Sequence, residues 1–238
     1  DLIQQQWYID RKVDDRIATM PTDNLISKIK NRESDIVLYG ITPPKKGTSE
    51  EKVSEISARQ VERLQDLSVD GLVLYDIQDE KSRTDEERPF PFMETLDCYD
   101  YSQQHLTNLK IPKIIYRAVG KYSETELSDF LTQADPTDIL SIFVGAASKS
   151  QEVTVSISDA YKIKAHTQSD VLLGGVVIPE RHQTKGDEHL RVFEKIAQGC
   201  KFFVSQGVYD VNASKNFLSD YYYYGKEQHI PLVPIFFT

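Results

Sequence analysis

Residues 171–182 have the sequence VLLGGVVIPERH, in which a continuous apolar run stops abruptly at a proline, two charged residues and a histidine. A continuous apolar run, unlike an alternating one, is typical of a strand that is buried on both faces of a parallel sheet. Polar residues that directly follow such a strand lie at the edge where α/β folds bind ligands. The stretch therefore predicts a buried parallel strand that presents Glu180 and His182 just past its end.

Six further apolar runs resemble this one and recur along the whole chain. They are 36–41, 71–75, 113–118, 139–144, 201–205 and 231–237. Helical patterns separate them: Ser123 and Glu126 form a capping box, and apolar residues recur at helical spacing near 53–67, 187–198 and 213–224. A strand followed by a helix, repeated at intervals of about 30 residues, is the arrangement of βαβ units.

We therefore predict the α/β class and, within it, a (β/α)8 TIM-type barrel over residues 35–238, with an open doubly wound sheet as the alternative. Residues 1–34 are predicted to be an N-terminal extension and a lead-in helix. Seven strands are one short of closure, so we expect the barrel to be incomplete at the C-terminal end of this chain. The alternative source of an eighth strand is the segment 1–20.

Composition excludes several classes of partner. The formal net charge of −9 argues against broad contact with nucleic acid phosphates. A membrane helix would need an uninterrupted apolar stretch of about 18 residues, which the sequence lacks. The two cysteines, Cys98 and Cys200, form neither a disulfide framework nor a metal motif. Such a low number of cysteines suits a reducing compartment, and we therefore expect a cytoplasmic protein.

Candidate site residues are those that follow the predicted strands. They are Asp76, Gly145, Ala146, Glu180, His182 and Gln206. One interpretation of this set is a metal-dependent barrel enzyme, because Glu180 and His182 would point the same way in an extended segment, with Asp187 and His189 nearby. Neither spacing matches a diagnostic metal motif, so no metal ligand is assigned. The Gly174-Gly175 pair lies inside a strand, where it indicates a bulge or close packing and not a phosphate cradle.

The last third of the chain resembles methylenetetrahydrofolate reductases. Their pattern here is Tyr-Pro-Glu-x-His, then a helix ending Lys-x-x-x-Gly-Ala, then a strand ending Thr-Gln-x-x-Phe-Asp. The residues that match in order and spacing are Pro179, Glu180, His182, Lys195, Gly199, Gln206 and Asp210. A fainter resemblance reaches back to residue 35, through ITPPKKG at 41–47 and SRTDEE at 82–87.

This resemblance implies a (β/α)8 barrel that binds FAD at its strand ends and takes hydride from NAD(P)H. The reaction it implies is the reduction of methylenetetrahydrofolate to methyltetrahydrofolate. Gln206 would hold the pterin ring, because an amide can donate and accept hydrogen bonds at once. His182 and Lys195 would lie near the ribityl and phosphate portion of the flavin, and Gly145 would also belong to the cofactor site.

The sequence departs from the family at several positions, among them its usual acidic residues. The family's glutamate after strand one falls on Gly40, its aspartate after strand four on Ala146, its strand-three histidine on Tyr116, and the tyrosine of Tyr-Pro-Glu on Ile178. General acid catalysis contributes ~10²–10⁴-fold, so losing the donor should nearly silence the reaction. Asp76 or Glu180 could serve as the catalytic acid instead, if burial raises its pKa.

The resulting hypothesis is a divergent oxidoreductase of one-carbon metabolism, a flavoprotein that binds a folate-type small molecule. Two alternatives stay open. One is a relative that binds a pterin or another one-carbon carrier without catalysis or with different chemistry, as part of a complex. The other is the metal-dependent barrel enzyme built around Glu180 and His182. With any of these functions, the protein could form a homo-oligomer or bind a complex partner.

Overall fold

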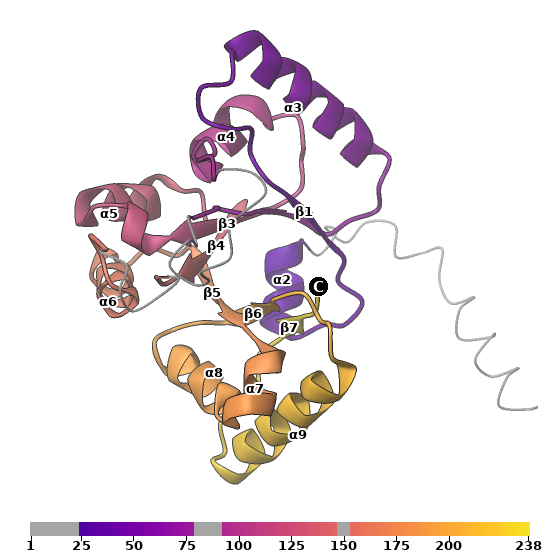
Figure 1. The fold of residues 1–238 in the computed structure, drawn as a ribbon, viewed down its shortest axis with the longest axis vertical. Coiled ribbons are helices and arrows are strands. Elements are labelled where there is room, and N and C mark those ends of the chain that lie inside the picture. The colour runs from indigo at the N-terminus through magenta and orange to yellow at the C-terminus, as the bar shows by residue number, and fades with distance from the viewer. Residues whose placement is uncertain (1–23, 79–91, 147–152) are drawn as a thin grey trace, which may run out of the picture.

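The computed structural model describes residues 24–78, 92–146 and 153–238. The predicted segment 1–20 and the SRTDEE motif lie outside these ranges. In the described part, seven parallel strands form one sheet in their chain order (Figure 1). The strands are β1 (Leu38–Ile41), β2 (Gly71–Leu74), β3 (Lys113–Ala118), β4 (Ile139–Val144), β5 (Leu172–Val177), β6 (Phe202–Ser205) and β7 (Ile235–Phe236).

Helices follow the strands along one side of the curled sheet (Figure 1). They are α3 (Glu50–Gln65), α4 (Cys98–His105), the short η3 (Val119–Lys121), α5 (Glu124–Gln133), α6 (Ile157–Thr167), α7 (Pro179–Lys185), α8 (Glu188–Ala197) and α9 (Val211–Glu227). The predicted capping box is present, with the Ser123 hydroxyl accepting from the Glu126 amide. The fold is thus a TIM-like half-barrel, in which β1 and β7 are the two edges of the described sheet.

A helix in front of the first strand fills the concave side of the sheet. In α2 (Leu25–Asn31), Leu25, Ile26 and Ile29 are buried against inward-facing side chains of the strands, such as Ile114 and Phe202. Burying an aliphatic side chain of this size stabilises the fold by roughly 1.5–3 kcal/mol. Because α2 closes the interior from one side, the carboxyl ends of the strands remain open to a ligand.

The glycine pair in β5 is explained by close packing. Gly174 and Gly175 pair in regular register with Phe202 and Phe203 of β6, so there is no bulge between them. A Cβ atom on Gly174 would lie 2.5 Å from the Phe202 ring, and one on Gly175 would lie 2.7 Å from the Phe203 ring. The two rings therefore cover both faces of β5 where side chains would otherwise stand.

We expect Gly174→Ala to lower the free energy of unfolding by ~1–3 kcal/mol, because the new methyl group overpacks the space that Phe202 fills. Urea denaturation followed by circular dichroism measures the change. Gly207→Ala is the matched control, since a Cβ there would meet the Tyr209 ring at 3.4 Å, an ordinary contact. Equal stability of the Gly174 variant and the wild type would contradict this account of β5.

No helix among the described residues is both long enough and apolar enough to span a bilayer.

Candidate functional site

A cavity of about 430 Å³ opens at the carboxyl ends of the strands. Its walls come from β3 to β5 and from the segments that follow β2 and β6, and they include Asp76 and Gln206. The expectation that residues after separate strands meet at one rim is therefore correct for these two. Gln78 also lines this cavity and donates from Nε2 to the Gly145 carbonyl at 3.2 Å, so Gly145 lies directly behind the wall.

Gln206 reaches this cavity from a rigid position. Its backbone N–H donates to the Val177 carbonyl at 2.9 Å, which holds the first residue after β6 against the end of β5. The preceding Ser205 is buried, and its hydroxyl accepts from the Thr238 amide at 3.0 Å. The Gln206 side chain is exposed at the wall, and no other described residue hydrogen-bonds its amide. The amide is thus free to bind a ligand.

Asp76 is fully engaged by the protein. Its carboxylate, 2% exposed, accepts from the Ala118 amide at 2.8 Å, the Lys121 ammonium at 2.5 Å and the Tyr122 hydroxyl at 3.0 Å. The contacts suit a residue that fixes the end of β2 to the end of β3, and the role of proton donor stays a prediction.

Two tyrosines form the aromatic part of the same wall. The rings of Tyr75 and Tyr116 lie edge to face with centroids 4.9 Å apart. Burial raises the pKa of the Tyr75 hydroxyl, which is therefore neutral at physiological pH. A Cβ atom on Gly40 would lie 2.6 Å from the Tyr75 ring. The ring thus occupies the space next to the position where the reductases carry their glutamate.

We expect Gly40→Glu to destabilise the protein by ~1–3 kcal/mol, because the new side chain displaces Tyr75. In a Tyr75→Ala background, which leaves room for it, the same substitution should cost less. A double-mutant cycle measured by thermal unfolding tests this coupling. If the losses of stability from the two substitutions simply add, contact with the Tyr75 ring is not the reason that residue 40 is a glycine.

Glu180 does not line the cavity. Its carboxylate accepts from the backbone amides of Tyr209 and Asp210 at 3.0 and 3.3 Å, so it ties the start of α7 to the loop before α9. Burial acts to raise the pKa of Glu180, but these backbone hydrogen bonds outweigh it and the pKa lies below its ordinary value. A general acid at this position needs a raised pKa, and the catalytic role of Glu180 stays a prediction.

The two residues expected at the flavin phosphate also lie outside the cavity. His182 is buried against α9, with Nε2 3.0 Å from the Asp220 carboxylate. Lys195 donates from Nζ to the Val176 carbonyl at 2.6 Å, and burial lowers its pKa. In the described residues these side chains form no cradle that could hold FAD next to Gln206, so we derive no step through a flavin.

The set of residues that could bind a metal ion also differs from the predicted one. Asp187 pairs with Arg191, and Glu180 holds backbone amides, so neither joins His182. His182 instead meets His189 and Asp220. Sequence reasoning missed Asp220, which carries no local signal. It also missed Gln78, which follows the second strand as Asp76 does, so the rule that selected Asp76 applies to it equally. Tyr75 was missed because it ends the apolar run 71–75, whereas β2 stops at Leu74.

A second cavity, of about 610 Å³, lies between the two edges of the sheet. The segment 32–38, the inner face of β1 and the end of the chain from 232 to 238 line it. Tyr75 and Thr238 line both cavities, so the two spaces adjoin.

The fold is shared with a protein whose ligand is known. It superimposes with a TM-score of 0.80 on an uncharacterized protein from Clostridium thermocellum that binds two copies of 5-methyl-5,6,7,8-tetrahydrofolic acid. The two sequences are 51% identical, and the match covers 90% of this chain and 68% of that protein.

Two further matches are distant. Two structures of anSMEcpe, one with bound AdoMet and a peptide and one with AdoMet, are 11% and 9% identical, at TM-scores of 0.42 and 0.40. Each match covers 83% of this chain and 63% of the other, and similarity this low carries no argument about function. No family model and no curated protein matches the sequence.

Proposed function

We propose, because this chain belongs to the same family as the Clostridium thermocellum protein, that it binds a reduced folate of the 5-methyltetrahydrofolate type in the cavity at its strand ends. The relative's bound folate, at 51% identity, is the observation that carries the proposal. The geometry of the cavity supports it. Cavities of roughly 300–1,000 Å³ with mostly apolar walls and a few polar groups are typical of small-molecule sites.

The chemistry of Gln206 suits the pterin ring. The edge of a pterin offers hydrogen-bond donors and acceptors side by side, and a primary amide can satisfy both. Tyr75 and Tyr116 supply aromatic surface next to the amide, and Asp76 holds the loop that carries Tyr75. The glutamate tail would then extend toward solvent through the open mouth. The adjoining cavity between β1 and β7 offers room for a second copy.

Reduction of methylenetetrahydrofolate with NAD(P)H is the finer hypothesis, and the geometry does not favour it. Tyr75 fills the space beside Gly40, the pKa of Glu180 is lowered, and His182 and Lys195 are engaged elsewhere. We therefore propose a protein that binds the folate as a carrier, and we assign it no hydride transfer.

Isothermal titration calorimetry of the full chain with 5-methyltetrahydrofolate tests the proposal. We expect saturable binding, and much weaker binding of p-aminobenzoylglutamate, which has the tail but lacks the pterin. Equal affinity for the two compounds, or no heat with either, would rule out recognition of the pterin by this protein.

A further inference from the structure

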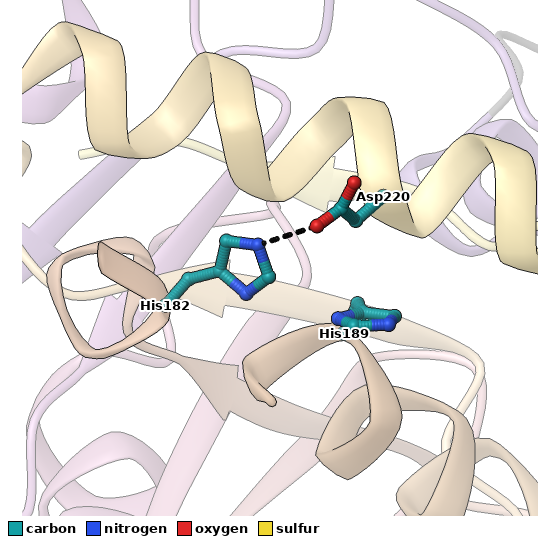
Figure 2. Close-up of side chains that lie close together, drawn as sticks. All are labelled: His182, His189 and Asp220. Carbon is teal, nitrogen blue, oxygen red and sulfur yellow. Dashed lines mark hydrogen bonds and ion pairs between the residues drawn. The ribbon is translucent and has the colours of Figure 1, made fainter. Parts of the chain in front are cut away.

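Three helices outside the folate cavity bring two histidines and an aspartate together. His182 comes from α7, His189 from the first turn of α8, and Asp220 from α9 (Figure 2). The two imidazole rings lie edge to face with centroids 5.2 Å apart. One nitrogen or oxygen atom from each of the three side chains lies within 4.8 Å of those of the other two.

Both histidines keep a buried nitrogen without a partner. Nδ1 of His182 and Nδ1 of His189 make no hydrogen bond, although His182 is only 6% exposed. Leaving a buried polar atom unsatisfied costs roughly 1–3 kcal/mol, so two such atoms side by side require an explanation.

The group is open to solvent on one side. A cavity of about 320 Å³ is lined by His182, Asp220 and the polar side chains Gln183, Asn216 and Ser219. Asp220 itself is more than half exposed, with 56% of its side chain accessible, so it can move without disturbing the core. Water can therefore reach the side of the group that His182 and Asp220 form.

We propose that His182, His189 and Asp220 bind one divalent first-row transition-metal ion, with Zn²⁺ as the first candidate. Two imidazoles and one carboxylate are a common set of three protein ligands for such ions, and water fills the remaining position. Ligand atoms in a tetrahedral zinc site are about 3.3 Å apart, given Zn–N bonds of about 2.0–2.1 Å. The group closes to that size through side-chain rotation, above all of Asp220.

Such an ion would join α7 and α8 to α9 and would stabilise the folded chain by mass action. The site shares no lining residue with the folate cavity. Metal binding and folate binding can therefore succeed or fail independently.

The test uses the full chain after treatment with EDTA. Titration with Zn²⁺ against a chromophoric chelator should show one tight site, and bound Co²⁺ should give visible d–d absorption. We expect His189→Ala to weaken Zn²⁺ binding about 100-fold and Asp220→Asn at least about 10-fold, and to abolish the Co²⁺ signal. Both positions avoid the deeply buried His182, so the variants should fold, which their circular dichroism spectra verify.

Two control variants separate this site from ordinary surface binding. His166→Ala removes an exposed histidine from α6, and Glu227→Gln removes an exposed carboxylate from α9. Both should bind Zn²⁺ like the wild type. The proposal is overturned if the wild type binds no tighter than His189→Ala, or if a control weakens binding as much.

Discussion

Replacing Asp97 with asparagine should lower the free energy of unfolding by about 3–5 kcal/mol. This is the largest loss of stability that we expect from any of the proposed substitutions. Asp97 precedes α4, where its side chain caps the helix by accepting from the amides of Tyr99 and Asp100. The other carboxylate oxygen accepts from Arg117. Asparagine keeps a side-chain oxygen for the cap, so the variant isolates the effect of losing the negative charge.

The size of the effect follows from the surroundings of Arg117. The residue is 4% exposed on β3, and its guanidinium lies 4.1 Å from the centroid of the Phe130 ring. Aromatic faces attract the cation but cannot neutralise it. Removing the carboxylate therefore leaves a buried charge uncompensated, which is the costly way to break such a pair.

The same pair predicts a dependence on pH. Burial acts to raise the pKa of Asp97, but the charge of Arg117 and the hydrogen bonds outweigh it, so the pKa lies below its ordinary value. A carboxyl group whose pKa is lower in the folded state contributes stability above its unfolded pKa of about 3.9, and this contribution is lost as the pH falls through the folded pKa. The wild type should thus lose more stability on acidification than Asp97→Asn does.

Urea unfolding at pH 7 and at acid pH measures both effects. Asp129→Asn, which removes an exposed carboxylate from α5, is the control and should change stability by less than about 0.5 kcal/mol. A loss below about 1 kcal/mol for Asp97→Asn at pH 7, or identical acid sensitivity of variant and wild type, would show that the pair is not structurally important.

The second large effect concerns the ligand. Gln206→Leu should weaken binding of 5-methyltetrahydrofolate about 30- to 100-fold, because the pterin edge would face an apolar side chain and lose its hydrogen bonds in a partly buried site. Leucine has a similar volume, and the Gln206 backbone bond to Val177 does not depend on the side chain. The fold should therefore be unchanged.

Calorimetric titration of both proteins measures the ratio of the dissociation constants. Gln103→Leu, an exposed position on α4, controls for adding an apolar side chain to the surface. A dissociation constant for Gln206→Leu within about threefold of the wild type would remove Gln206 from the site.

The sequence predicted the strands well because their signal is local. Each continuous apolar run became a strand of the parallel sheet, and the helices near 187–198 and 213–224 formed as α8 and α9. The start of α7 was misjudged, since residues 179–185 continue from β5 as a helix and not as an extended segment. Proline at the first helical position was the available signal, because its fixed φ suits a helix start.

The residues of the candidate site were predicted only in part, because contacts between residues far apart in the sequence leave no local pattern. Asp76 and Gln206 share a cavity because parallel strands bring their carboxyl ends to one rim. His182 was expected there too, but the helical turn of α7 directs it to Asp220, which is 38 residues away. No local pattern encodes a contact between α7 and α9, because it arises from packing.

The crystal structure of the full chain grown with 5-methyltetrahydrofolate tests the central claim most directly. We predict that the pterin lies in the cavity at the strand ends, with its edge hydrogen-bonded to the Gln206 amide and its face near Tyr75 or Tyr116. A folate found solely in the space between β1 and β7, or on the outer helices, would contradict the assignment of this cavity.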